Sequence, residues 1–63
     1  MKAYYDRIKK EMNFKAKNVN EMLKELKIMR NTVIVVANNE IVDEDYNFKE
    51  KDKVKILSVV SGG

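Results

Sequence analysis

The sequence predicts an α+β fold in which one helix packs diagonally across one face of a mixed sheet of four or five strands. Three observations lead to this prediction: an unbroken β-branched run at residues 32–37, a single amphipathic stretch at residues 19–26, and several shorter segments with strand-like patterns. The chain has 63 residues and a mass of 7.4 kDa, which suffices for one domain with one small core. The elements are expected in the order strand, strand, helix, strand, short strand, strand.

The first two strands are predicted to form a hairpin. Residues 3–8 are rich in tyrosine, and residues 11–17 alternate apolar and polar side chains. The chain is expected to turn between them near residues 9–10. On the second strand, one face carries Met12, Phe14 and Ala16. The inward face of the first strand stays open between two pairs, Tyr4 with Ile8 or Ala3 with Tyr5.

A short amphipathic helix is predicted after the hairpin. Asn18 suits the N-cap, and Glu21 three residues later completes a capping-box pattern that satisfies the first free amides of a helix. Apolar side chains then recur at helical spacing, and we expect them in the core: Val19, Met22, Leu23 and Leu26. The charged side chains between them are expected to face water: Glu21, Lys24, Glu25 and Lys27.

Residues 32–37 are predicted to form a strand in the middle of the sheet, because an unbroken β-branched run needs a partner on each edge. Asn38 and Asn39 follow as a two-residue turn, since asparagine tolerates the positive φ angles of a type I′ hairpin. Residues 40–42 are then expected to return as a short strand.

An acidic run at residues 43–45 opens the next loop. It lacks the spacing and the glycine of a calcium-binding loop, so we interpret it as a solvated loop and assign no metal site. Tyr46 and Phe48 are expected to anchor this loop to the core, and residues 51–53 to turn the chain into a last strand at residues 54–60. Only one pair of neighbouring strands needs to be parallel, and we expect the first and last strands to lie side by side in the middle of the sheet.

The composition excludes the commonest catalytic and metal-binding groups. Cys and His are absent, which removes thiol nucleophiles, imidazole bases and the usual zinc ligands. The longest apolar run, at residues 33–37, is far shorter than the roughly 20 residues that cross a bilayer, so no membrane contact is expected. The first residues carry charge where a signal peptide is apolar, and a cytoplasmic location is expected.

The net charge of +3 is divided between unlike halves, +5 in residues 1–31 and −2 in residues 32–63. The lysine-rich first half, with Tyr4, Tyr5 and Phe14 as stacking side chains, keeps a small RNA-binding module open as an alternative function. A solvated surface explains the same lysines, so nucleic acid is the less favoured partner.

Glycine occurs only at Gly62 and Gly63, and proline does not occur. Glycine ordinarily serves in turns and close backbone contacts, so its restriction to these two positions is the most informative feature of the sequence. We expect a folded domain at residues 1–60 and a flexible tail at residues 61–63. Taken alone, such a tail is better explained as a frayed end.

Four segments together carry a family resemblance. They are residues 19–26 on the helix, residues 32–42 as a hairpin, residues 51–57 leading into the last strand, and residues 60–63 at the end. In combination they resemble the ubiquitin-like β-grasp sulfur carriers of the ThiS/MoaD family, closer to the thiamine-pathway type. Two turns depart from that pattern: Asn39 stands where the family usually has glycine, and residues 51–53 read Lys-Asp-Lys where it often has Asp-Gly-Asp.

The resemblance implies that a partner enzyme adenylates the carboxylate of Gly63, which then becomes a thiocarboxylate that donates sulfur. A side chain at Gly62 or Gly63 would obstruct passage through a narrow active-site channel. The implied partners are a ubiquitin-activating-type adenylating enzyme, which would hold ATP and magnesium, and a sulfur-accepting synthase. The chain itself is then expected to be a carrier and not an enzyme, and to bind no cofactor.

We expect the sulfur to be used in thiamine thiazole synthesis. Molybdopterin synthesis and tRNA thiolation are the closely related alternatives. A related alternative is a ubiquitin-like protein modifier, in which Gly63 is joined to a lysine of a target protein. In either role we expect the protein to be a monomer when it is not bound to a partner enzyme, because the core is small and the tail must stay free.

The last strand offers a surface for the partner. If Val54 and Ile56 point into the core, then Leu57 and Val59 point outward and leave an apolar pair beside the tail. The expected partner-binding residues are therefore Leu57, Val59, Ser61 and Gly62. The alternative is that a neighbouring loop or the helix covers Leu57 and Val59.

Overall fold

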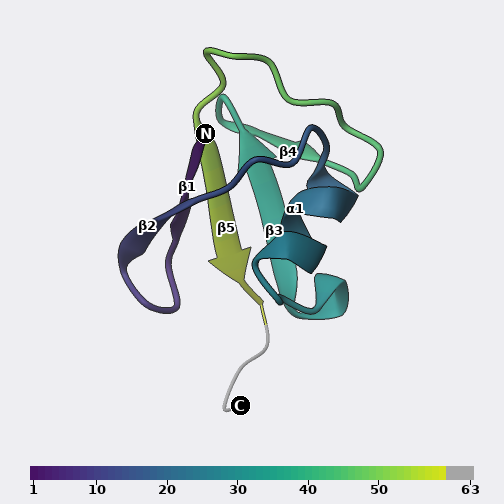
Figure 1. Ribbon diagram of the computed structural model, residues 1–63. Coiled ribbons are helices and arrows are strands. Elements are labelled where there is room, and N and C mark those ends of the chain that lie inside the picture. The colour runs from purple at the N-terminus through teal and green to yellow at the C-terminus, as the bar shows by residue number, and fades with distance from the viewer. Residues whose placement is uncertain (60–63) are drawn as a thin grey trace.

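The computed structural model describes residues 1–59, which contain five strands and one α-helix (Figure 1). In chain order the elements are β1 (Lys2–Tyr5), β2 (Lys10–Asn13), α1 (Val19–Glu25), the 3₁₀ turn η1 (Arg30–Thr32), β3 (Val33–Ala37), β4 (Glu40–Val42) and β5 (Val54–Ser58). The predicted order of strands and helix is confirmed, and one short 3₁₀ turn precedes β3.

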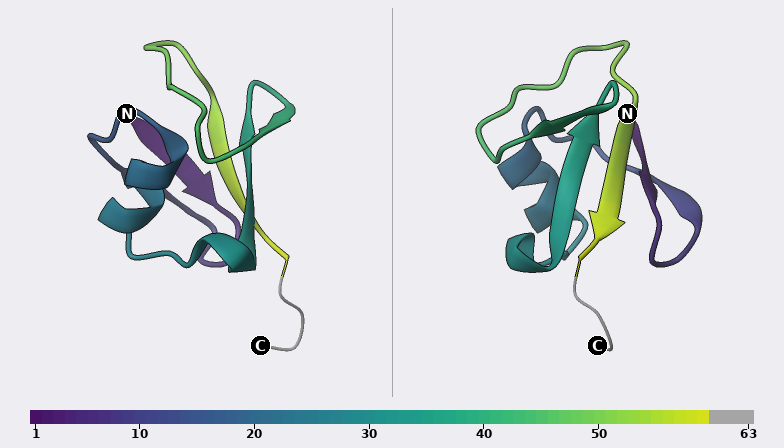
Figure 2. Two further views of the ribbon diagram at one scale, coloured as in Figure 1. Left: turned by 90° about the vertical axis from the view of Figure 1, so that its right-hand side faces the viewer. Right: turned by 180° about the vertical axis from the view of Figure 1, so that it is seen from behind.

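The five strands form one mixed sheet in the order β2-β1-β5-β3-β4. β1 and β5 are parallel, and every other neighbouring pair of these strands is antiparallel. Both views in Figure 2 place α1 on one face of the sheet. This arrangement confirms the α+β prediction and the expected contact between the first and last strands, and it is that of a β-grasp fold.

The central strand of the sheet is β5, whereas the β-branched run at residues 33–37 forms β3. β3 pairs with β5 on one edge and with β4 on the other, so the expected partners on both edges are confirmed. The expectation that this strand lies in the middle of the sheet is wrong, because β3 is the neighbour of the middle strand β5. An unbroken apolar run shows that a strand is interior, and β3 and β5 are both interior.

The first hairpin is shorter than predicted. β1 ends at Tyr5 rather than at residue 8, and residues 6–9 form the turn, in which Lys9 has a φ of 53°. In β1, Ala3 is fully buried and Tyr5 packs against the core, whereas Tyr4 is exposed, as is Ile8 in the turn. The inward pair is therefore Ala3 with Tyr5.

β2 ends at Asn13 rather than at residue 17, although the apolar alternation continues. The pairing with the β1 side continues to the first residue, since the N–H of Phe14 donates to the carbonyl of Met1 at 2.8 Å. The next two amides have another acceptor. The N–H groups of Lys15 and Ala16 both donate to the carboxylate of Glu25, at N···O distances of 3.0 Å. Glu25 is exposed as predicted, and it also fastens this segment to the end of α1.

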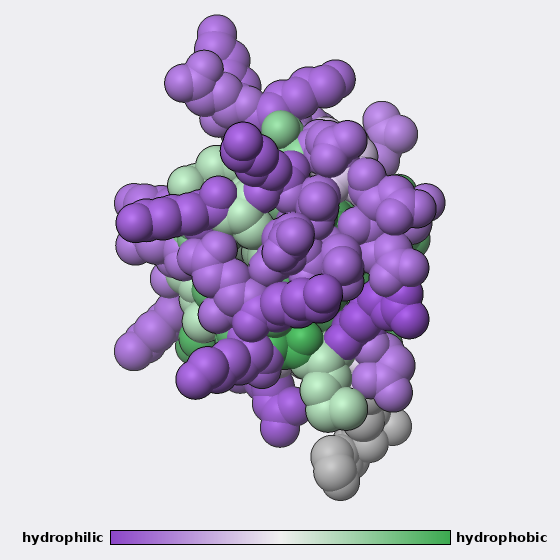
Figure 3. Space-filling view, turned by 45° about the vertical axis from the view of Figure 1, so that its right-hand side comes forward, coloured by the Kyte–Doolittle hydropathy of each residue, from purple (hydrophilic) through white to green (hydrophobic). Residues whose placement is uncertain are grey.

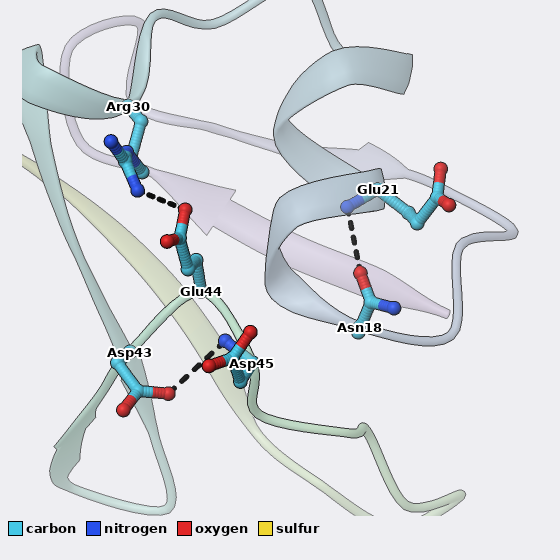
Figure 4. A network of polar contacts seen from close by, with 6 residues as sticks. All are labelled: Asn18, Glu21, Arg30, Asp43, Glu44 and Asp45. Carbon is cyan, nitrogen blue, oxygen red and sulfur yellow. Dashed lines mark hydrogen bonds and ion pairs between the residues drawn. The ribbon is translucent and has the colours of Figure 1, made fainter.

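The helix begins as predicted. Asn18 is the N-cap, and its Oδ1 accepts a hydrogen bond from the backbone N–H of Glu21 at 2.8 Å (Figure 4). The first three residues of the apolar stripe are buried, and Leu26, which follows the last helical residue, is half-buried against the core. The stripe is therefore core, as the sequence predicts.

The core lies between α1 and the face of the sheet that α1 covers. The cluster is formed by Ala3, Phe14, Val19, Met22, Leu23, Val33, Val35, Val54 and Ile56. Met22 on α1 and Ile56 on β5 are both 0% exposed. Removal of this apolar surface from water, worth about 25 cal/mol per Å², joins the helix to the central strand.

The turn and the long loop before β5 follow the prediction closely. Asn38 and Asn39 have φ angles of 54° and 68°, which confirms the turn with two positive φ angles. In the loop, the ring of Phe48 lies 5.1 Å from that of Phe14 and 5.8 Å from that of Tyr46, measured between centroids. Both aromatic residues of the loop therefore anchor it to the core.

β5 spans Val54–Ser58 and so stops short of the predicted residue 60. Val54 and Ile56 are buried, as expected, and the strand is followed by Val59, which is 49% exposed. The predicted end of the strand at Val60 lies outside the described residues, and so does the boundary between domain and tail.

Candidate functional site

Three of the predicted site residues, Ser61, Gly62 and Gly63, lie outside the described residues. The described part of the candidate site is therefore the end of β5, where Leu57 and Val59 are located, together with the surface around it. Leu57 is half-buried and Val59 exposed.

The end of β5 is held by hydrogen bonds on both edges. On the β1 side, the N–H of Ser58 donates to Oδ1 of Asp6 at 2.8 Å, and the N–H of Asp6 donates to the carbonyl of Ile56 at 3.0 Å. On the β3 side, the N–H of Val59 donates to the carbonyl of Thr32 at 3.0 Å. The chain is thus fixed up to residue 59.

Sequence reasoning did not identify Asp6 as part of this site. The residue lies 52 positions before Ser58, so no local pattern connects the two. The available signal was an aspartate at the start of a hairpin turn, a position that aspartate favours for reasons unrelated to β5.

The face of the sheet opposite α1 carries an apolar patch beside the end of β5. Strand register places Leu57 opposite Ile34, and Val36 opposite Ile41. These four residues are called the outer patch below. Ile41 is 74% exposed and the other three are half-buried.

Neither the helix nor the long loop covers the outer patch. Figure 2 shows α1 and residues 43–53 on the same side of the sheet, and the view from behind shows β3 and β5 in front of α1. Of the two interpretations of Leu57 and Val59, the structure therefore favours an accessible apolar surface. Lys55, at the centre of this face, lies opposite Val36 on one side and Tyr4 on the other.

The side of the molecule that carries α1 is mostly hydrophilic. Figure 3, in which that side comes forward, is dominated by hydrophilic side chains, and hydrophobic ones show only in small areas. An apolar patch on the bare face of the sheet is the kind of surface that marks a protein interface.

The carboxylates of the acidic loop have partners within the chain. Glu44 forms an ion pair with Arg30, and Oδ1 of Asp43 accepts from the N–H of Asp45 at 3.1 Å (Figure 4). Within residues 1–59, no three acidic side chains are grouped so that they could hold a metal ion. The same residues contain no helix that is long and apolar enough to span a membrane.

The proposed stacking residues of an RNA-binding module are not brought together. Phe14 is 2% exposed in the core, and Tyr5 packs against the core from the inner face of β1. Tyr4, on the opposite face, is 38% exposed. A nucleic-acid base could therefore stack on one of the three aromatic rings, that of Tyr4. This arrangement does not favour an RNA-binding surface.

A polar network around Asp52 fastens the long loop to the β3–β4 turn. Its carboxylate accepts from the hydroxyl of Tyr46 at 2.6 Å, from the N–H of Lys49 at 2.8 Å and from the side-chain amide of Asn38 at 2.8 Å. Chiefly through the bond from Tyr46, these donors lower the pKa of Asp52 below its ordinary value of 3.8. The same bond raises the pKa of the Tyr46 hydroxyl above 10.0.

We expect this network to make stability depend on pH at both ends of the scale. Because folding lowers the pKa of Asp52, its contribution is complete above pH 3.8 and is lost as the pH falls through the lower, folded-state pKa. Because folding raises the pKa of Tyr46, its contribution is complete below pH 10.0 and is lost as the pH rises through the folded-state pKa. Urea unfolding across this range measures both effects.

The substitution Asp52→Asn should flatten the acid limb of that curve, and Asp45→Asn, which removes the same charge from the same loop, should not. An acid limb of equal steepness in the Asp52→Asn variant and the unaltered chain would contradict this account of the network.

One family comparison covers nearly the whole chain. The model of the ThiS family matches residues 4–63. The matched range begins within β1, includes every later strand and α1, and runs through Gly63. Among curated proteins, none matches this sequence significantly.

Proposed function

The chain belongs to the ThiS family of sulfur carriers, and from this premise we propose that sulfur is carried on the carboxylate of Gly63. Proteins of this family are carriers and not enzymes, and they bind no cofactor themselves. The observation that carries the proposal is the family match itself, because it extends through both terminal glycines.

The proposed chemistry takes place in two steps on a partner of the ThiF adenylating type. A carboxylate oxygen of Gly63 first attacks the α-phosphorus of ATP, so that pyrophosphate leaves and a carboxyl adenylate forms. A sulfur nucleophile from a donor persulfide or sulfide then attacks the carbonyl carbon and displaces AMP. With sulfide as the nucleophile, this displacement yields the thiocarboxylate directly. With a persulfide it yields an acyl disulfide, whose S–S bond is then broken by a thiol; the thiol forms a disulfide with the sulfur of the donor, and the thiocarboxylate leaves. The partner would supply magnesium and the catalytic side chains.

Thiamine thiazole synthesis is the proposed destination of this sulfur, and a thiazole-forming synthase the proposed acceptor. The support for it is the family match. We place this chemistry in the cytoplasm.

The proposal is tested by intact mass spectrometry of the chain after incubation with a ThiF-type enzyme of the source organism, ATP and a sulfur donor. The expected result is a mass increase equal to the replacement of one oxygen by sulfur, which disappears when ATP is omitted. If the same enzyme activates another carrier and leaves this chain unchanged, the proposal is wrong. Covalent conjugates of the chain with cell proteins would indicate the modifier alternative instead.

We further propose that the outer patch is where the adenylating enzyme docks. Leu57 lies next to Ile34 on the bare face of the sheet, and the strand that carries it leads directly to the tail. An enzyme that covers this patch buries apolar surface and receives the tail at the same end of β5. The exposed Val59 extends the apolar surface towards residues 60–63.

The substitution Leu57→Asp is expected to raise the KM of the adenylating enzyme for the carrier by about 30-fold or more. A charge at the centre of an apolar contact costs roughly 2 kcal/mol or more, as for other interface hot spots. The measurement is ATP–pyrophosphate exchange at varied carrier concentration, with circular dichroism to confirm the fold.

The matched control is Ile8→Asp, which places the same charge on an exposed apolar residue of the β1–β2 turn and should leave the KM close to that of the unaltered chain. Loss of the native circular dichroism spectrum with Leu57→Asp would identify Leu57 as a core residue. An unchanged KM in a folded Leu57→Asp variant would place the docking surface elsewhere.

A further inference from the structure

We infer that the carboxylate of Asp6 fixes the direction in which the chain leaves β5, and that it thereby positions the tail for adenylation. This inference rests on the proposed function. Asp6 is half-buried, follows β1 directly, and lies beside the end of β5.

The hydrogen bonds show that the side chain of Asp6 replaces a missing backbone acceptor. The last regular rung between β1 and β5 is the bond from the N–H of Asp6 to the carbonyl of Ile56. In a continued parallel ladder, the N–H of Ser58 would next donate to the carbonyl of Asp6. That carbonyl instead accepts from the N–H of Lys9 within the turn, at 3.3 Å. The N–H of Ser58 is satisfied by Oδ1 of Asp6, at 2.8 Å.

The side chain therefore extends the ladder by one bond at the point where the backbone of β1 turns away. An ionised carboxylate is also a stronger acceptor than the carbonyl that it replaces. On the other edge of β5, the next residue, Val59, is held by the carbonyl of Thr32. Two consecutive residues are thus fixed from opposite sides, and only the contact on the β1 side depends on a side chain.

This contact matters because the reactive group lies a short distance along the chain. Gly63 lies four residues after Val59, and a fully extended segment of that length spans at most about 14 Å. The position of the Gly63 carboxylate relative to a docked domain is therefore limited by the direction of the chain at Ser58 and Val59. Holding a reacting group close to its productive geometry is a large part of how a bound substrate reacts quickly.

Steady-state adenylation kinetics separate positioning from simple stabilisation. The carrier is the substrate of the adenylating enzyme, so a partly unfolded carrier raises the apparent KM, whereas a misdirected tail on a folded, docked carrier lowers kcat. For Asp6→Ala we expect kcat to fall about fivefold, the effect of one net hydrogen bond, while KM stays near that of the unaltered chain.

Two further variants define the cause. Asp6→Asn removes the charge and keeps an amide oxygen as acceptor, so it should restore most of the kcat lost in Asp6→Ala. Asp43→Ala is the matched control, because it also removes an aspartate that accepts from a backbone N–H, that of Asp45, at a place remote from β5. Its kcat should stay at the level of the unaltered chain.

Amide hydrogen exchange measured by NMR provides the direct structural readout. Exchange at the N–H of Ser58 should be faster in Asp6→Ala than in the unaltered chain, and close to normal in Asp6→Asn.

Three results would overturn the inference alone: an unchanged kcat in Asp6→Ala, a rise in KM without a fall in kcat, or an equal loss of kcat in Asp6→Asn and Asp6→Ala. If the unaltered chain itself is not adenylated, the proposed function fails and the inference fails with it.

Discussion

Removal of Gly62 and Gly63 is expected to abolish adenylation and thiocarboxylate formation while the free energy of unfolding changes by less than about 0.5 kcal/mol. The chemical loss follows from the proposal that Gly63 supplies the reacting carboxylate, since the shortened chain would end in the bulkier Ser61, too far back to reach ATP. Stability should persist because the described core lies wholly between Ala3 and Ile56. Intact mass spectrometry and urea unfolding of both chains measure the two effects.

The control for this deletion is a chain of the original length with Gly62→Ala. It keeps the terminal carboxylate and adds one methyl group, so it tests whether the second glycine is needed for passage through the channel. We expect it to be adenylated more slowly than the unaltered chain. Thiocarboxylate formation on the chain that lacks both glycines would show that the proposed reacting group is wrong.

The substitution Ile56→Ala is expected to destabilise the fold by about 2–5 kcal/mol, the usual cost when a large aliphatic side chain is removed from a core. Ile56 is 0% exposed and lies on the central strand, with Tyr5 and Val35 opposite it on the two neighbouring strands. A domain of this size has a total stability of only about 3–9 kcal/mol. The variant should therefore lose a large share of its total stability, as urea unfolding monitored by circular dichroism will show.

Ile8→Ala provides the comparison for Ile56→Ala. The residue type and the substitution are the same, but Ile8 is 46% exposed in the β1–β2 turn. Its loss should cost less than about 0.5 kcal/mol, in line with other surface substitutions. Similar destabilisation by the two substitutions would mean that the core is not centred on β5.

The features that the sequence predicted well are those set by neighbouring residues. The N-cap at Asn18 and the turn at Asn38 and Asn39 depend on the conformational preferences of single residues and on contacts within a few positions. The apolar stripe of α1 is likewise a local pattern. These elements were found at the predicted positions because no distant contact competes with their preferences.

The features that the sequence predicted poorly depend on residues far apart in the chain. After β2, the pairing with the β1 side reaches Met1 at Phe14, and the amides of Lys15 and Ala16 then donate to Glu25, ten and nine positions away. The inner face of β1 is decided by its pairing with β5, and the role of Asp6 by its contact with Ser58. Of the candidate site, Leu57 and Val59 were predicted from alternation along the strand, whereas the rest of the outer patch comes from β3 and β4 and required the register of the sheet.

The parallel pairing of β1 with β5 also governs when the chain can fold. β5 is the last element and the central one, so the register of Ala3 with Val54 closes a loop that contains nearly every other element. Closing so long a loop is entropically costly and makes folding slower than in a helical protein of similar size. On the ribosome, β1–β2 and β3–β4 emerge as two separate hairpins with no strand between them. A chain terminated before β5 would therefore stay unfolded and be open to proteolysis. Because it would not fold, it could not bind the activating enzyme and compete there with the complete carrier.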